Sequence, residues 1–229
     1  MKFDNVDIST YGAMIMDDYN VGSANVSSGF ILSASSTTPI GYSMRIGERE
    51  FTVPIAFVAD STLNAIANKS KLATDLCKGT VEIYDDENDI YYSAVLTGIS
   101  NEQILMDNVY TAEFEFSGVM HGALISFTQS GSFTPKGYAE NGEDCRISVT
   151  ARTLESDGTY KVAGITFSED AVANGTSIVI DGFDKIVYIN GANGMQYCDL
   201  VSFPRLYPGK SNYIECKDPV TIEYYPVYK

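Results

Sequence analysis

Apolar and polar residues alternate along several short segments of the chain, a pattern typical of half-buried β-strands. In such a strand one face packs on a core and the other faces solvent, as in antiparallel sheets. The clearest alternation runs over residues 51–57, 110–116, 145–152 and 220–224. The sequence therefore predicts a mainly β protein with antiparallel sheets.

One segment follows the helical period instead. From Ser61 to Cys77 the apolar residues recur every three or four positions. Asp60 or Ser61 suits the N-cap, and Gly79 suits the C-terminal stop. We therefore predict a single amphipathic α-helix over residues 61–77, packed on the sheet of the first half.

Turn residues distinguish the second half of the chain from the first. Six Asn-Gly or Asp-Gly dipeptides all follow residue 140, and both dipeptides favour the positive φ angles of tight β-hairpins. The stretch 127–141 between the halves is polar and rich in Gly and Ser. We therefore predict an N-terminal domain over residues 1–126, a linker region over 127–141 and a C-terminal antiparallel β-sandwich over 142–229.

Charge limits the classes of partner. The 229 residues include 15 Lys and Arg against 30 Asp and Glu, which gives a net charge of −15. Residues 1–121 hold 6 basic and 17 acidic side chains, whereas residues 122–229 hold 9 and 13. Because duplex DNA and anionic membranes are bound through clustered cations, both roles are disfavoured. The uneven charge also favours two domains.

The sequence gives no indication of export or membrane insertion. The first seven residues lack the apolar core of a signal peptide, and no apolar run approaches the ~18 residues of a membrane span. Four cysteines, Cys77, Cys145, Cys198 and Cys216, lie far apart and form no Cys-x-x-Cys pair. We expect free thiols in a protein made in a reducing cytoplasm.

The residues that usually carry catalysis or metal binding form no recognisable set. His121 is the single histidine, and we expect it to be a surface or turn residue near the domain boundary. The acidic run Asp85–Asp89 lacks the Gly and Glu of an EF-hand loop and is predicted to be a solvated hairpin loop. The usual nucleotide-binding, zinc-protease and serine-hydrolase motifs are missing too. We expect no catalytic residues, no metal site and no cofactor, which favours a structural or interaction role.

The last third of the chain carries an ordered motif around residues 203–214, followed by an aromatic segment at 221–228. This order resembles the C-terminal part of the distal tail proteins (Dit) of long-tailed, non-contractile bacteriophages, in which an FPxLxPGxNxI element precedes a final aromatic strand. The family pattern places Asn directly after Pro-Gly, whereas Lys210 and Ser211 intervene here, which we expect to lengthen the turn. The residues that match are Phe203, Pro204, Leu206, Pro208, Gly209, Asn212 and Ile214, followed by Tyr224, Tyr225 and Pro226.

The first half agrees with the same family more loosely. Tyr11-Gly12, the expected strand 51–58, the expected helix 61–77, the stretch 83–96 and the expected strand 109–116 follow the order of the family's N-terminal domain. The resemblance therefore covers nearly the whole chain. Its C-terminal motif is more specific than its N-terminal features.

This resemblance implies a fold and a function. The N-terminal domain would be a ring-forming β-sandwich or barrel-like domain with one helix, and six copies would form a homohexameric ring. The C-terminal domain would be a galectin-like antiparallel β-sandwich. The protein would be a non-enzymatic structural hub of the virion, assembled in the bacterial cytoplasm and placed at the distal end of the tail.

The same resemblance implies a set of partners. The hub would link the major tail or tube protein and the tape-measure protein to the tail-tip protein or baseplate and to receptor-binding proteins. It would leave a channel for DNA in transit and would not insert into a membrane. No catalytic, metal-binding or cofactor-binding residues carry over.

Two features of the N-terminal domain acquire an expected role within a ring. Some of its acidic side chains would line the channel and repel DNA phosphates, unless the acidity lies on the outer surface and serves solubility. The Ser-, Thr- and Asn-rich segment Asp17–Pro39 would be a hairpin arm that reaches a neighbouring subunit, or a surface loop.

Two other functions stay open. The first is a β-sandwich carbohydrate-binding module or adhesin, with a sugar site built from Tyr188, Tyr197 or Tyr207. The second is a hydrolase of cell-wall glycan that uses two carboxylates, although no pair of carboxylates stands out in the sequence.

Overall fold

The computed structural model of the chain consists of two compact units, Met1–His121 and Gly122–Tyr228. The described residues of the predicted linker region, 127–139, lie within the second unit. No helix among the described residues is long and apolar enough to cross a membrane. The structure describes residues 1–16, 19, 22, 24–31, 40–139 and 142–228.

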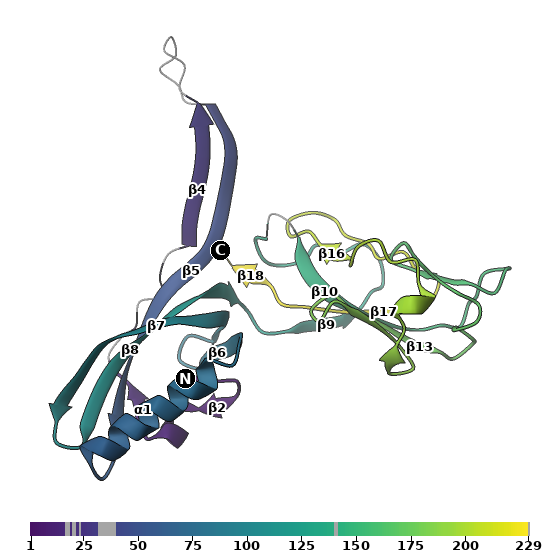
Figure 1. Cartoon of the computed structure of the whole chain (residues 1–229). Helices are drawn as coiled ribbons and strands as arrows, with labels where there is room; N and C mark the ends of the chain where they lie inside the picture. Colours follow the sequence, from purple (N-terminus) through teal and green to yellow (C-terminus); the bar gives the residue numbers. More distant parts are fainter. Residues whose placement is uncertain (17–18, 20–21, 23, 32–39, 140–141, 229) are drawn as a thin grey trace. The chain divides into compact units, whose positions relative to one another are not determined.

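The first unit is built on one antiparallel sheet with the strand order β2-β1-β6-β7-β8-β5-β3, and β4 pairs with β5 (Figure 1). A short 3-10 helix at Ile8–Tyr11 connects β2 to β3. The predicted antiparallel β architecture is confirmed. The strands are β1 (Lys2–Phe3), β2 (Val6–Asp7), β3 (Ala13–Ile15), β4 (Ala24–Ile31), β5 (Ile40–Val58), β6 (Val81–Asp85), β7 (Ile90–Met106) and β8 (Val109–His121).

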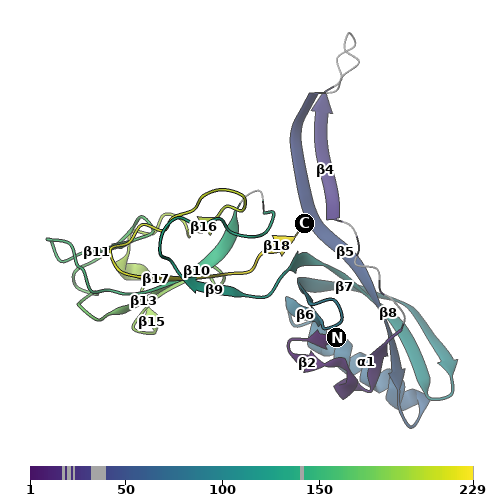
Figure 2. The ribbon, with the colours of Figure 1, turned by 180° about the vertical axis from the view of Figure 1, so that it is seen from behind.

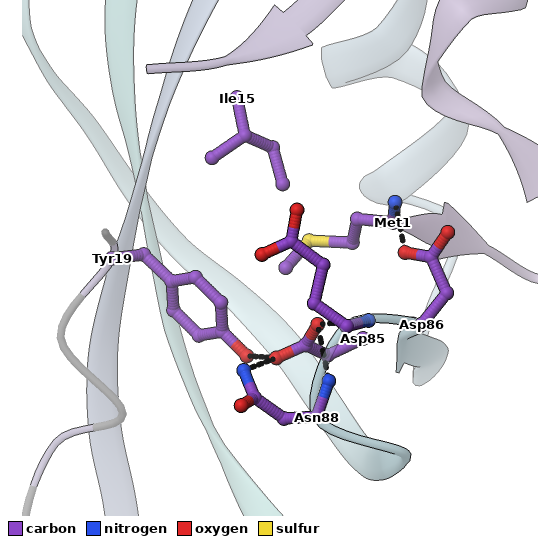
Figure 3. Close-up of a pocket in the computed structure, with 7 residues that line it drawn as sticks. Met1, Ile15, Tyr19, Asp85, Asp86 and Asn88 are labelled. Atoms are coloured by element: carbon purple, nitrogen blue, oxygen red, sulfur yellow. Dashed lines mark hydrogen bonds and ion pairs between the residues drawn. The ribbon is translucent and has the colours of Figure 1, made fainter. Parts of the chain in front are cut away.

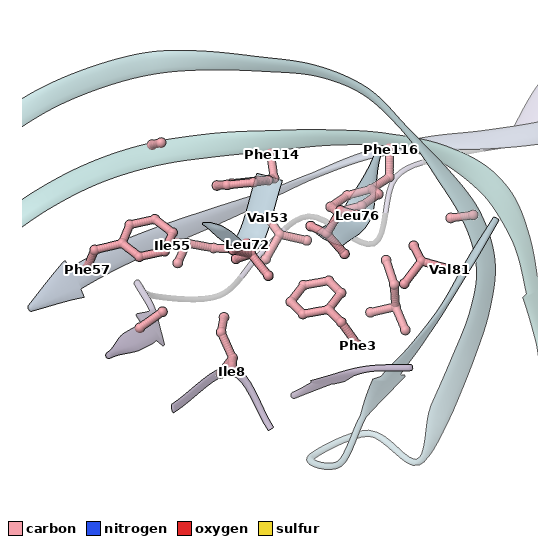
Figure 4. Packing of buried hydrophobic residues seen from close by; sticks show 14 of the residues in the cluster. Phe3, Ile8, Val53, Ile55, Phe57, Leu72, Leu76, Val81, Phe114 and Phe116 are labelled. Carbon is pink, nitrogen blue, oxygen red and sulfur yellow. The ribbon is translucent and has the colours of Figure 1, made fainter. Parts of the chain in front are cut away.

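The predicted helix is present as α1, Thr62–Leu76. Its N-cap is Ser61, whose backbone is extended and whose hydroxyl accepts the N–H of Asn64, as capping requires. The helix packs on one face of the sheet through Ala65, Leu72 and Leu76, which are buried. Figure 4 shows Leu72 and Leu76 among the apolar side chains of β5 and β8.

The core of the first unit uses the alternating positions that the sequence indicates. Phe51, Val53, Ile55 and Phe57 of β5 are buried, as are Ala112, Phe114 and Phe116 of β8. Directly paired residues share a face of the sheet, and Phe51 pairs with Phe116 while Phe57 pairs with Tyr110. The strand pairing thus aligns two apolar faces under α1.

Strand β5 belongs to two different parts of the first unit. Its second half pairs with β8, from Arg49↔Gly118 to Val58↔Val109. Its first half pairs only with β4 among the described residues, from Ile31↔Ile40 to Ala24↔Arg49. Figures 1 and 2 show this two-stranded ribbon, which we call the β4–β5 arm. Part of the predicted arm segment Asp17–Pro39 lies outside the described residues.

The second unit has a sheet of order β15-β14-β13-β10-β17-β9, and β16 pairs with β10. A separate hairpin, β11–β12, contributes Tyr160 and Phe167 to the same apolar core as Ile147 and Ile222. The strands are β9 (Ile125–Thr128), β10 (Glu143–Thr150), β11 (Tyr160–Val162), β12 (Ile165–Phe167), β13 (Ser177–Asp181), β14 (Ile186–Ile189), β15 (Ala192–Asn193), β16 (Arg205–Leu206), β17 (Val220–Tyr224) and β18 (Val227–Tyr228).

One of the predicted tight turns is a two-residue hairpin turn of the second unit, whereas neither residue of Asp181-Gly182 nor of Asn193-Gly194 has a positive φ angle. Asn190 and Gly191 have φ angles of 49° and 80° and connect β14 to β15. Both residues therefore adopt the positive φ angles that the two-residue hairpin turn needs. A second 3-10 helix, Met195–Tyr197, follows β15.

The position of His121 differs from the expectation of a surface or turn residue. His121 is the last residue of β8 and is only 4% exposed. Its ring stacks on Tyr91 with a centroid distance of 5.7 Å, and its Nε2 lies 3.1 Å from Ser93 Oγ. The surrounding strands bury the ring, so the histidine is a packed core residue at the end of the first unit.

Candidate interaction surfaces

The face of the first unit's sheet opposite α1 is acidic. Glu113 and Glu115 of β8 alternate with the buried Phe114 and Phe116 and therefore lie on the opposite face. Glu50 of β5 shares this face because it pairs with Ser117. Among the described residues of β3, β5, β7 and β8, the alternation of side chains places no Lys or Arg on this face. We call it the acidic face.

Hydrogen bonds hold the carboxylates of the acidic face. Ser100 Oγ donates to Glu115 at 2.5 Å, and Asn101 Nδ2 donates to Glu113 at 2.7 Å. Ser117 Oγ donates to Glu48 at 3.1 Å. These donors are neutral, so they position the carboxylates without cancelling their charge.

Strand β7 gives the same sheet an open edge. Its partner β6 covers only Ile90–Ala94, whereas β8 pairs with it as far as Met106. The backbone groups of residues 95–106 that face away from β8 therefore have no strand partner among the described residues. Several exposed apolar side chains follow this edge, with Val95 42%, Ile104 60% and Met106 61% exposed. An open, apolar edge is a template for strand addition from another chain.

The acidic run begins at Asp85, the last residue of β6, and leads to β7, and its residues 85–88 border a pocket of about 410 Å³ (Figure 3). Residues 86–89 are exposed, but the prediction of a solvated loop is wrong for Asp85. Asp85 is buried and accepts bonds from Tyr19 Oη at 2.5 Å and from Asn88 Nδ2 at 2.7 Å. Burial raises the pKa of Asp85, but the bonds from Tyr19, Asn88 and the backbone lower it by more. Asp86 pairs with the amino group of Met1 at 2.6 Å.

These carboxylates already have donors within the chain. Among the described residues no group of three or more His, Cys, Asp or Glu is arranged to hold a metal ion. The four cysteines are free, and burial raises the pKa of Cys145 to about 12. Such a thiol stays protonated near neutral pH and is a poor nucleophile.

The motif residues 203–214 form one ordered loop in the second unit. The side chain of Asn212 accepts the N–H of Tyr207 and donates to the carbonyls of Tyr207 and Lys210, each at 2.8 Å. The backbone of Asn212 exchanges two hydrogen bonds with Phe133. The two extra residues before Asn212 therefore lie inside a turn that the Asn212 side chain closes. We call residues 203–214 the motif loop.

The other motif residues support this loop or the strand that follows. Leu206 is fully buried beside β10, and Ile214 is 7% exposed. Gly209 has a φ of 72°, which favours glycine. Tyr224 is the buried last residue of β17, and its hydroxyl accepts the N–H of Lys136. Tyr225 lies against Phe183, and the carbonyl of Pro226 accepts the N–H of Gly122.

Replacing Asn212 by Ala should loosen the motif loop. The change removes three hydrogen bonds to the backbone, and we expect a loss of about 1–3 kcal/mol in the free energy of unfolding. Hydrogen–deuterium exchange should rise across residues 205–214. Asn193→Ala, which removes a single bond to the N–H of Met195, is the matched control. Equal exchange in both variants would contradict a closing role for Asn212.

The tyrosines proposed from the sequence for a sugar site lie on different elements. Tyr188 is on β14, Tyr197 is on the second 3-10 helix and Tyr207 is in the motif loop. Only Tyr207 of these three borders one of the pockets described here, where it lines two neighbouring hollows.

Glu143 is a buried carboxylate that was not predicted from the sequence. Glu143 begins β10 and is 2% exposed, and its Oε1 accepts the N–H of Val227 at 2.9 Å. Its Oε2 has no hydrogen-bond partner among the described residues. Glu143 lies two residues before Cys145 and four before Ile147, which are both buried. The alternation of inward and outward side chains along β10 therefore places the Glu143 carboxylate on the inward face, and this signal is present in the sequence.

Comparison with known proteins gives matches at the level of structure. No protein-family model matches the chain, and no curated protein matches it significantly. The crystal structure of phage SPP1 Dit, described as a hub of the adsorption apparatus in phages that infect Gram-positive bacteria, matches with a TM-score of 0.71. The match covers 99% of this chain and 98% of SPP1 Dit at 13% identity.

The baseplate of phage P2 in its activated conformation matches as well. Its structures with Ca and with Sr both give a TM-score of 0.61 at 8% identity, over 96% of this chain and 92% of the matched chain. The sequence motifs had indicated the same family. Along nearly its whole length the chain therefore has the fold of Dit, the hub protein of a phage adsorption apparatus.

Proposed function

We propose that the protein is a structural hub at the distal end of a siphophage tail. The observation that carries this proposal is the match to SPP1 Dit over 99% of this chain, which includes both units. In this role the hub links the tube and tape-measure proteins to the tail tip or baseplate and to receptor-binding proteins. It acts by binding and has no enzymatic activity.

The ring proposed for the first unit is supported by its open sheet edges. The β7 edge at residues 95–106 and the β4–β5 arm are different surfaces of one sheet. A closed ring needs a head-to-tail contact between two different surfaces of the same subunit. Strand pairing across such a contact satisfies backbone groups that are otherwise open, which favours ring closure.

The native mass tests this proposal. Six chains of 25.0 kDa give a particle of about 150 kDa, which light scattering distinguishes from a monomer. Negative-stain images of the same peak should show a ring with a central hole. A chain that stays monomeric at high concentration and with its tail-tip partner added would contradict the hub proposal and favour a carbohydrate-binding module.

A charge on the β7 edge should prevent ring assembly. We expect Ile104→Lys to shift the native mass from about 150 kDa to that of the monomer, because an edge lysine opposes strand addition. The residue is 60% exposed, so the fold should be retained. Val201→Lys, at a 98% exposed position of the second unit, is the control and should leave the ring intact.

The acidic face is proposed to line the DNA channel. DNA phosphates are repelled by Glu50, Glu113 and Glu115, so DNA passes without binding to the wall. Reversing these three residues to Lys should slow DNA ejection from assembled particles, most strongly at low salt. Reversing Asp157 and Glu169 of the second unit is the matched control. Ejection kinetics that equal those of the control would contradict the channel assignment.

A further inference from the structure

Strand β8 holds the open part of β7 through an interrupted ladder. The pairing of β7 with β8 shifts register at three places between Leu96 and Met106, and each shift is a bulge or irregularity. Bulged residues drop out of the ladder and increase the local twist. Beyond Ala94, where the pairing with β6 ends, β8 is the one strand partner of β7 among the described residues. The ladder alone therefore fixes residues 95–106 less firmly than a regular ladder would.

The middle shift turns Glu102 away from the acidic face. Ser100 pairs with Glu113 and shares its face, and Asn101 Nδ2 donates to the Glu113 carboxylate from the same face. Two consecutive residues thus lie on one face, which the φ of 48° at Asn101 permits. Glu102 consequently points to the α1 face, where it accepts a hydrogen bond from the hydroxyl of Tyr110, a member of the core under α1.

Lys69 of α1 meets Glu102 on this face. The Lys69 Nζ lies 2.8 Å from Glu102 Oε2 and 5.9 Å from the ring centre of Tyr110. The Lys69 side chain is 14% exposed and that of Glu102 is 39% exposed, so solvent screens this pair less than it screens two fully exposed charges. The bonds from Lys69 and Tyr110 lower the pKa of Glu102, which keeps the carboxylate ionised near neutral pH. We call Lys69, Glu102 and Tyr110 the α1–β7 clamp.

A second attachment lies at the turn between β7 and β8. The backbone N–H of Asn108 donates to the hydroxyl of Thr62, the first residue of α1, at 3.4 Å, and its carbonyl accepts the N–H of Ala59 at 3.2 Å. Figure 1 shows the start of α1 near this turn. These bonds hold the end of the hairpin, whereas the clamp holds the middle of the open part of β7. Lys69–Glu102 is the one ion pair between α1 and β7 among the described residues.

We propose that Lys69 is a positioning residue for ring assembly, which through Glu102 holds the open edge of β7 in the geometry that accepts a strand from a second copy of the chain. This inference rests on the ring of the proposed function, in which the same edge of every copy meets another surface of its neighbour. The clamp also sets the position of Ile104, which lies two residues further along the same face and is 60% exposed.

The clamp favours assembly by ordering the edge before a neighbour arrives. An edge that already has one geometry loses less conformational entropy when a strand is added. If the edge is competent for pairing only a tenth of the time, the apparent dissociation constant rises about tenfold. Loss of the clamp should therefore weaken the ring and leave the fold of the first unit in place.

Native mass over a dilution series of the full-length chain tests the inference. For Lys69→Met we expect the concentration at which half of the chains form the particle of about 150 kDa to rise about tenfold or more. Lys71→Met is the matched control, because it removes a neighbouring cation of α1 that lies over the ring of Tyr11 and is not part of the clamp. Lys69→Arg keeps the charge and should assemble like the unaltered chain.

Hydrogen exchange of the dilute, unassembled chain tests the clamp without a ring. Exchange should rise in residues 102–106 for Lys69→Met and for Glu102→Gln, and the double variant should show no further rise, because both changes break one interaction. Lys71→Met should leave this exchange unchanged. Thermal midpoints close to that of the unaltered chain establish that the variants are folded.

The outcomes separate this inference from the proposed function. If the unaltered chain forms a ring and the Lys69→Met and Lys71→Met rings dissociate at the same concentration, the positioning role of Lys69 is wrong and the hub proposal stands. Exchange that rises throughout the first unit, together with a lower thermal midpoint, would show that Lys69 supports the fold as a whole. If no variant and no unaltered chain assembles, the proposed ring fails and this inference fails with it.

Discussion

Replacing Glu143 by Gln should stabilise the protein at pH 8 by about 3 kcal/mol and leave its stability at pH 5 nearly unchanged. Burial raises the pKa of Glu143 to about 7, although the N–H of Val227 opposes this shift. The side chain is 2% exposed, and within the part of the chain that the structure describes its Oε2 has no hydrogen-bond partner. The ionised form is therefore poorly solvated in the folded state.

The direction in which stability changes with pH follows from the raised pKa of Glu143. A carboxyl group with a raised pKa binds its proton more tightly in the folded than in the unfolded state. The free energy of unfolding therefore falls as the pH rises from about 4.5 to about 7, and no further loss occurs above this range. A glutamine side chain at this position has no charge to bury, so the Glu143→Gln variant should not lose stability across this interval.

Calorimetric unfolding of the full chain between pH 5 and pH 8 would measure the effect. Hydrogen exchange at Val227 and Tyr138, whose backbone groups are bonded to each other near Glu143, would locate it. Glu169→Gln is the matched control at an exposed position of the same unit and should gain no stability at pH 8. A parallel pH dependence in the unaltered chain and in Glu143→Gln would show that Glu143 is not its source.

Replacing Asp218 by Ala should destabilise the second unit by about 3–5 kcal/mol. The Asp218 carboxylate is 8% exposed and accepts the backbone N–H groups of Arg152 and Thr153 at 2.7 and 3.0 Å. It also accepts the hydroxyls of Thr153 and Tyr160. Alanine removes this acceptor from the N–H groups of Arg152 and Thr153 and from both hydroxyls, of which Tyr160 Oη keeps a contact with Cys216 Sγ at 3.1 Å.

The pH dependence at Asp218 has the opposite sign to that at Glu143. Burial raises the pKa of Asp218, but the four donated hydrogen bonds lower it by more, so the pKa lies below the ordinary value of 3.8. The stability that the carboxylate contributes is therefore complete above pH 3.8 and is lost as the pH falls through the lowered pKa. Asp218→Asn should retain part of the bonding and lose less than Asp218→Ala. Denaturant titration at pH 7 would compare them, and equal stability of all three proteins would contradict a structural role for the carboxylate.

The sequence allowed the local structure to be predicted where one physical rule dominates. Alternation identified the buried faces of β5 and β8, and with them Glu113 on the opposite face. Capping by Ser61 and the spacing of Leu72 and Leu76 identified α1 within two residues at each end. These features depend only on neighbours along the chain.

Features that depend on distant residues could not be predicted in the same way. The pairing of β10 with both β13 and β17 joins segments that are about 30 and about 70 residues apart. Lys185 and Arg205 border the same hollow of the second unit, which no local pattern indicates. The prediction that His121 is a surface or turn residue is wrong because its ring stacks on Tyr91, a partner on another strand.

The continuity of β5 has a mechanical consequence. A force applied to the β4–β5 arm along the direction of β5 is transmitted through one unbroken backbone into the sheet. There the bonds between β5 and β8, from Arg49↔Gly118 to Val58↔Val109, lie across the direction of pull. They are loaded together in shear, whereas a peeling geometry would break them one after another. The arm is thus anchored so that tension is spread over the whole β5–β8 ladder.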